Sequence, residues 1–456
     1  MSSKATERLS DIARWTGQMP QSVLTLLALA DGLRAGRAFL SLLLAVGITL
    51  GFAGSSAPTD RQVRFQAIDE VIAGRKFSLV GWEFAALGEK IAAWQANTGA
   101  GLEREQARAV VLGYIEGIRR MRQAEEHINR LVSVNAPDSQ VAQAQEELAD
   151  LRQRQQARRP LVEAVIQRQV ADVLADAGLG VGGSPVPPVN FTFTEPPQIL
   201  IISPRQEIRN IRAQMLVPQI DSAEAGEKEA DIAERTDFSA YITRIGGLGA
   251  YPTMVVESTN LEWVVSTVAH EWVHNYLTLF PLGMRFGSSP ELTTLNETVA
   301  DIVGDEVGRR VLVRYYPEFA RPEATQAGQT PEQSAEPSVP LPEPDPPPFD
   351  FNREMRTTRL RVDELLAAGR YIDAEAYMEA RRQVFVENGY HLRVLNQAYF
   401  AFHGSYATGG ASSSPIGDQL QELQRIKTPD DIAGFLHTVR WFTSAGDLER
   451  VLGTEK

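Results

Sequence analysis

Cysteine is absent from the 456-residue chain, and there are only six histidines. The lack of cysteine excludes disulfides, thiolate metal ligands, cysteine nucleophiles and lipoprotein anchors. It leaves the redox compartment open, because a chain without cysteine is compatible with either side of a membrane. Because histidine is scarce, two histidines at metal-ligand spacing are a specific signal.

Positive charge is also in deficit. Lysine and arginine together number 45 against 58 aspartates and glutamates, which gives a formal net charge of -13. With no basic patch to offset this balance, nucleic acid is not an expected partner. The length, with 43% hydrophobic residues, is sufficient for two or three folded units with a sizeable core.

Long apolar runs are rare, and the most prominent covers residues 38–54. As a helix it would span about 25 Å, at the short end of what crosses a bilayer. Arg34 and Arg37 precede it, so the positive-inside rule predicts a cytoplasmic N-terminus, one transmembrane helix and the rest of the chain outside the cytoplasm. A cleaved signal peptide fits less well, because a long region precedes the run and Pro58 follows the best small-residue site. A buried helix of a soluble domain is the third reading of this run.

Two of the histidines lie four residues apart, in the stretch His270-Glu271-Trp272-Val273-His274. On a helix this spacing places both imidazoles on one face, with Glu271 beside them. Two imidazoles that converge on one point make up half of a zinc site.

The apolar pattern then breaks at residues 281–290. A new helix is expected from near Glu291, with Ser288 or Ser289 as its cap, and it contains Asn-Glu-Thr-Val-Ala-Asp at residues 296–301. In an antiparallel helix pair, His274 and Glu297 would each lie roughly 9 Å from the turn, so they can meet at one metal ion.

Together the two stretches resemble the HExxH zincins, and among them the gluzincins, in which NExxxD follows HExxH on the next helix. Every defining position is filled. The metzincin extension is excluded, because Leu277 and Phe280 occupy the positions of its glycine and its third histidine.

This resemblance implies a zinc-dependent peptidase that acts on peptides or proteins. His270, His274 and Glu297 would be the ligands of Zn²⁺, and Glu271 would be the general base for an activated water molecule. Asp301, one helical turn after Glu297, would accept the outer N–H of a ligating histidine and fix its orientation.

The donor that stabilises an oxyanion must come from another part of the chain. In the stretch 396–406, polar groups follow an amphipathic helix, and His403 or Tyr406 is expected to take this role. The stretch loosely resembles the Asn-Asn-Ala-Arg-Leu segment, with a downstream tyrosine, of predicted bacterial zinc aminopeptidases. Asn396, Ala398 and Tyr406 match, whereas the other three positions differ, so substrate preference does not carry over. For His403, a purely structural role is an equal alternative.

The expected fold class is α+β and mostly helical. It comprises a zincin-like catalytic domain, with a small sheet, the HExxH helix and the ligand helix, behind a long helical hairpin and a transmembrane helix. An edge strand within residues 247–256 is expected to pair with an extended peptide. Ten of the 26 prolines fall in residues 317–348, which predicts a disordered insertion. The expected segments are 1–37 cytoplasmic, 38–54 transmembrane, 60–178 helical hairpin, 189–316 catalytic core, 317–350 proline-rich insertion and 351–456 C-terminal helical part.

The sequence therefore predicts a membrane-anchored zinc metallopeptidase with an extracytoplasmic catalytic domain. One alternative is a catalytically retired binding or scaffold protein with the zincin fold, against which the presence of Glu271 argues. Another is a membrane-tethered interaction protein whose hairpin is the functional part. The motif does not distinguish an aminopeptidase from an endopeptidase, and it gives no oligomeric state.

Overall fold

A computed structural model describes residues 59–79, 81–83, 86, 101–320, 349–428 and 430–453. The expected cytoplasmic segment 1–37, the apolar run 38–54 and most of the proline-rich insertion, residues 321–348, lie outside these residues. The chain divides into two units, residues 1–66 and 67–456, and every element that bears on the site belongs to the second.

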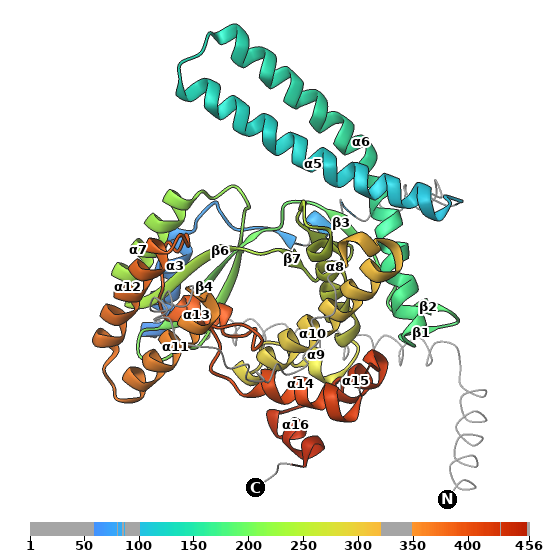
Figure 1. The fold of residues 1–456 in the computed structure, drawn as a ribbon. Helices are drawn as coiled ribbons and strands as arrows, with labels where there is room; N and C mark the ends of the chain where they lie inside the picture. Colours follow the sequence, from blue (N-terminus) through green and yellow to red (C-terminus); the bar gives the residue numbers. More distant parts are fainter. Residues whose placement is uncertain are drawn as a thin grey trace, which may run out of the picture. The chain divides into compact units, whose positions relative to one another are not determined.

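The described part of the second unit is mostly helical, with small sheets, which confirms the α+β class (Figure 1). Helices that pack around the candidate site come from both the middle and the end of the chain. The helices among the described residues are α3 (Asp60–Val71), α5 (Arg104–Ser133), α6 (Asp138–Asp176), α7 (Ser222–Thr236), α8 (Leu261–Leu277), α9 (Pro281–Met284), α10 (Pro290–Tyr315), the 3₁₀ helix η1 (Pro317–Phe319), α11 (Phe351–Ala367), α12 (Tyr371–Glu387), α13 (Gln397–His403), α14 (Ile416–Lys427), α15 (Ile432–Val439) and α16 (Ala445–Leu452).

The prediction of a single-pass membrane protein is corrected by the structure. Within the described residues, no helix is both long enough and apolar enough to cross a membrane. The longest helices, α5, α6 and α10, carry charged residues along their whole length, which a lipid environment would not accommodate.

Two three-stranded sheets lie in the middle of the chain. In one, β4 (Gln198–Pro204) is the central strand between β5 (Arg212–Leu216) and β6 (Phe238–Arg244), with both pairings antiparallel. In the other, β3 (Phe191–Phe193) runs parallel to β8 (Thr253–Val255), and β7 (Gly247–Leu248) pairs antiparallel with β8 at the edge. A short pair, β1 (Gly180–Val181) and β2 (Ser184–Pro185), occupies the glycine-rich stretch before β3.

Helices α5 and α6 form an antiparallel hairpin whose base joins the main core. Tyr114 of α5 is fully buried there, and its carbonyl accepts a hydrogen bond from Gln155 of α6. Farther out, α6 buries only Ala144 and Leu148 before Gln155, and the described residues of α5 beyond Ile118 include none that is buried. The outer half of the hairpin is therefore held by one narrow apolar seam.

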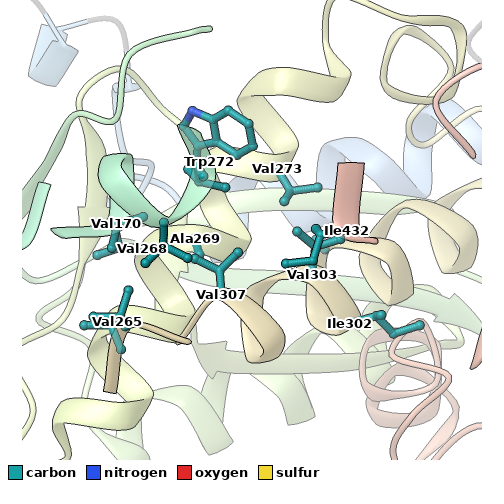
Figure 2. Close-up of a cluster of buried hydrophobic side chains, with 14 of the residues drawn as sticks. Val170, Val265, Val268, Ala269, Trp272, Val273, Ile302, Val303, Val307 and Ile432 are labelled. Carbon is teal, nitrogen blue, oxygen red and sulfur yellow. The ribbon is translucent and has the colours of Figure 1, made fainter. Parts of the chain in front are cut away.

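Helices α8 and α10 form a second antiparallel pair, which lies in the centre of the core. Their apolar faces pack together through side chains that include Val268, Val303 and Val307, with Ile432 of α15 beside them (Figure 2). Within this pair the two backbones approach closely: a Cβ at Gly304 would lie 2.9 Å from the Ser266 carbonyl oxygen. Glycine at this position lets the two helices bring their polar residues together.

Candidate metal centre

Local capping determines where the two site helices begin. Asn260 caps α8 by accepting a hydrogen bond from the Trp263 amide at 3.1 Å, and Ser289 caps α10 by accepting one from the Leu292 amide at 3.2 Å. Pro290 occupies the first turn of α10, where its missing N–H is not needed. The expected start of the second helix, with Ser289 as its cap, is confirmed.

His270 and His274 of α8 and Glu297 of α10 converge on one point. Their two Nε2 atoms are 3.1 Å apart, and Glu297 Oε2 lies 3.6 Å from Nε2 of His270 and 3.4 Å from Nε2 of His274. For bonds of about 2.1 Å to a tetrahedral zinc ion, the ligand atoms would be about 3.4 Å from one another. The three separations therefore fit one small ion at their centre.

The outer nitrogen of each histidine has an oxygen partner on α10. His270 Nδ1 lies 3.1 Å from Asp301 Oδ1, and His274 Nδ1 lies 2.7 Å from Asn296 Oδ1. An N–H donated from each Nδ1 leaves the Nε2 lone pairs directed at the centre. A contact between Asp301 and one of the histidines was expected from the sequence. Asn296 was not assigned a role, although it directly precedes the expected ligand Glu297.

One oxygen of the Glu297 carboxylate lacks a hydrogen-bond partner among the described residues. The side chain is buried, and the oxygen concerned is Oε2. Burial opposes ionisation, yet positive charge on the two nearby imidazoles holds the pKa of Glu297 below its usual value. Burial would lower the pKa of His270, but Asp301 and Glu297 raise it well above its usual value. A cation would satisfy the unpaired oxygen and both nitrogen lone pairs at once.

Glu271 lies beside the trio and is itself buried, which raises the pKa of its carboxyl. The edge strand β7 runs directly over it: a Cβ at Gly247 would collide with the Glu271 carboxylate. At Gly249 a Cβ would lie 3.4 Å from Glu271 Oε2 and 3.3 Å from the Cβ of His274. Gly247 in the edge strand and Gly249 just after it thus bring the backbone close to Glu271 and to His274, a feature that spacing along the sequence did not reveal.

The two residues expected as oxyanion donors lie in different surroundings. The ring of Tyr406 is 6.5 Å from the ring of His270, centroid to centroid. Burial raises the pKa of its hydroxyl well above the usual value, and the carboxylates of Glu297, Glu271 and Asp301 add to the rise. Tyr406 therefore remains a protonated donor beside the centre.

His403 instead packs among the aromatic rings of Tyr241, Tyr399 and Phe402. Its Nε2 lies 3.1 Å from the hydroxyl of Tyr241, and its ring lies 4.3 Å from that of Tyr399. Burial lowers the pKa of His403 to about 4, so the imidazole is neutral near pH 7. The structure brings Tyr406 to the centre, and it gives His403 partners that belong to the scaffold.

One aromatic residue at the rim was not anticipated. Phe286, in the turn between α9 and α10, is half exposed and has its ring 6.0 Å from that of His274.

Comparisons with protein-family models, with curated proteins and with solved structures give no match. The assignment of a function therefore depends on the geometry of the site.

Proposed function

We propose that this protein is a zinc-dependent peptidase of the zincin type, with the gluzincin ligand set. The observation that carries the proposal is the buried His270, His274 and Glu297 trio, whose unpaired carboxylate oxygen and two facing nitrogens match the donor set of a catalytic zinc site. A structural zinc site has four protein ligands, whereas this one offers three, which leaves a position for water or substrate.

The residues around the trio supply the other parts of a hydrolytic site. A bound zinc ion would polarise a peptide carbonyl and lower the pKa of a water molecule. Glu271 is placed to take the proton of the attacking water and to pass it to the leaving amine. Tyr406 is placed to donate its hydroxyl proton in a hydrogen bond to the oxygen on which negative charge develops.

The edge strand β7 offers a way to hold the substrate. Its outer side has no strand partner among the described residues, so an extended peptide can add to the sheet by backbone hydrogen bonds. Because Gly247 and Gly249 lie against Glu271 and His274, a peptide in this position would pass beside the metal centre. This mode of binding favours peptides over esters and over amides that lack a peptide backbone.

The test compares the full-length protein with Glu271→Gln and His270→Ala. We expect about one zinc ion per chain in the wild type and in Glu271→Gln, and none in His270→Ala. Hydrolysis of a mixed peptide library should be lost in both variants, whereas the matched control His127→Ala, on the exposed side of α5, should retain metal and activity. Zinc binding without hydrolysis in the wild type would favour the retired scaffold, and no zinc binding would refute the metal site.

A further inference from the structure

The turn that carries Tyr406 is hydrogen-bonded to the same helix that supplies Glu297. The amide of Ala407 donates to Thr298 Oγ1 at 3.2 Å, and the hydroxyl of Thr408 donates to Asp301 Oδ2 at 3.0 Å. Thr298 is completely buried, whereas Thr408 is exposed. The bond to Thr298 is therefore the better shielded of the two, and it lies between the backbone of Ala407 and the residue that follows Glu297.

Close backbone approaches confine the same turn from other sides. A Cβ at Gly417, in α14, would collide with the carbonyl oxygen of Ala407, and one at Gly410 would collide with that of Asn352 in α11. Glycine at these positions lets α11 and α14 pack directly against the turn. The turn therefore packs against α11 and α14 as well as against α10, where the amide of Ala407 meets the hydroxyl of Thr298.

We propose that Thr298 is a positioning residue, whose hydroxyl holds the Tyr406 turn in register with Glu297 and Asp301 on α10. Glu297, Asp301 and Tyr406 would then keep fixed positions relative to one another. The inference rests on the proposed peptidase function for its catalytic consequence, and the contact between Thr298 and Ala407 can be tested separately. Hydrolysis is sensitive to such positioning, because a displacement of about 1 Å at a reacting group can cost about 100-fold in rate.

The test uses Thr298→Val, which keeps the shape of the side chain and removes the acceptor. Thr298→Ser keeps the hydroxyl, and Thr294→Val makes the same change one turn earlier in α10, at another buried threonine. We expect Thr298→Val to lower kcat by about tenfold to 100-fold with little change in KM or zinc content. Serine should restore most of the rate, and Thr294→Val should change kcat less than about twofold.

A double-mutant cycle with Tyr406→Phe identifies the route of the effect. If Thr298 acts through Tyr406, Thr298→Val should cost less than about twofold in kcat once the tyrosine hydroxyl is gone. An equal loss in both backgrounds would overturn the proposal.

Amide hydrogen exchange supplies a readout that needs no peptidase activity. Thr298→Val should speed exchange in the segment 404–411 by about tenfold or more, and Thr294→Val should not. Unchanged exchange in Thr298→Val would refute the positioning role, even in a chain that cleaves no peptide. Faster exchange in a chain without Glu271-dependent hydrolysis would uphold the contact and reject the peptidase function.

Discussion

The outer half of the α5–α6 hairpin and the α8–α10 pair place their charged residues in opposite environments. In the α5–α6 hairpin, ion pairs such as Arg152 with Glu125 and Arg154 with Asp150 lie on the surface, with side chains about half exposed. In the α8–α10 pair, Glu271 and Glu297 are buried at 6% and 9% exposure. Burial of charged groups is unfavourable unless partners or a metal compensate, so polar residues that remain buried mark a site. This difference supports the proposal of a site in the α8–α10 pair.

The largest expected difference between the two helix pairs is in how the free energy of unfolding responds to added zinc when a residue of each pair is changed. At zinc concentrations of about 1,000 times Kd, binding should add about 4 kcal/mol to the free energy of unfolding, a gain that His270→Ala should lose. His127→Ala, on the exposed side of α5, should keep the full gain. Chemical denaturation with zinc and with a chelator measures the difference. Equal stabilisation of wild type and His270→Ala would contradict the assignment of this ligand.

Acid should destabilise the core through a buried histidine, His403. Burial lowers the folded-state pKa of His403 to about 4, so the unfolded chain binds a proton there more readily. The contribution of His403 to stability should therefore be constant above about pH 6.5 and should fall as pH drops from about 6.5 to 4, by up to about 3 kcal/mol.

The His403→Gln variant isolates this contribution. Its free energy of unfolding, followed by denaturant titration across the same pH range, should fall less steeply than that of the wild type. His127→Gln should follow the wild-type curve, since this side chain is exposed. Parallel curves for wild type and His403→Gln would show that His403 charges equally in the folded and unfolded chain.

A glycine-to-alanine change should have opposite signs in the two pairs. In α10, Gly304→Ala places a methyl group 2.9 Å from the Ser266 carbonyl oxygen and 3.0 Å from the His270 Cβ, which should cost about 1–3 kcal/mol and weaken zinc binding. In α5, the described atoms leave open space at Gly113, so Gly113→Ala should gain up to about 1 kcal/mol from helix propensity. Urea unfolding measures both, and a gain in each would show that α8 and α10 are not closely packed.

The smallest effect is expected from an ion pair on the hairpin. Arg154 and Asp150 lie 2.5 Å apart, but their side chains are 67% and 53% exposed. Exposed pairs contribute little, so Arg154→Ala should change the free energy of unfolding by less than about 0.5 kcal/mol. A loss above about 1 kcal/mol in the same urea experiment would mean that the outer hairpin depends on its surface charges.

Helical periodicity explains how much of the site could be predicted. It placed His270 and His274 on one face, and the Ser289 cap fixed the start of the helix that carries Glu297. The mostly helical α+β class was likewise readable from local patterns. The roles of Asn296 and Gly247 were not, because they depend on contacts between elements whose packing the local pattern does not specify.

The choice between His403 and Tyr406 shows the same limit. Helix α13 ends at His403, and the turn that follows places the ring of Tyr406 near that of His270, while His403 contacts the hydroxyl of Tyr241. A separation of three residues would place His403 and Tyr406 on the same face only if the helix continued, but α13 ends at His403. The membrane prediction was wrong, because no helix among the described residues is long and apolar enough to cross a membrane.

The contact between the edge strand and Glu271 also bears on how related chains can be recognised. A side chain at Gly247 would displace the Glu271 carboxylate, so purifying selection should hold the glycine as firmly as the acid. The surface of the hairpin is free to diverge, because its charged residues face solvent. Ancient relatives that have lost all overall similarity should therefore still share a Gly-x-Gly pair upstream of the histidine motif, and a profile built on these two features together would find them.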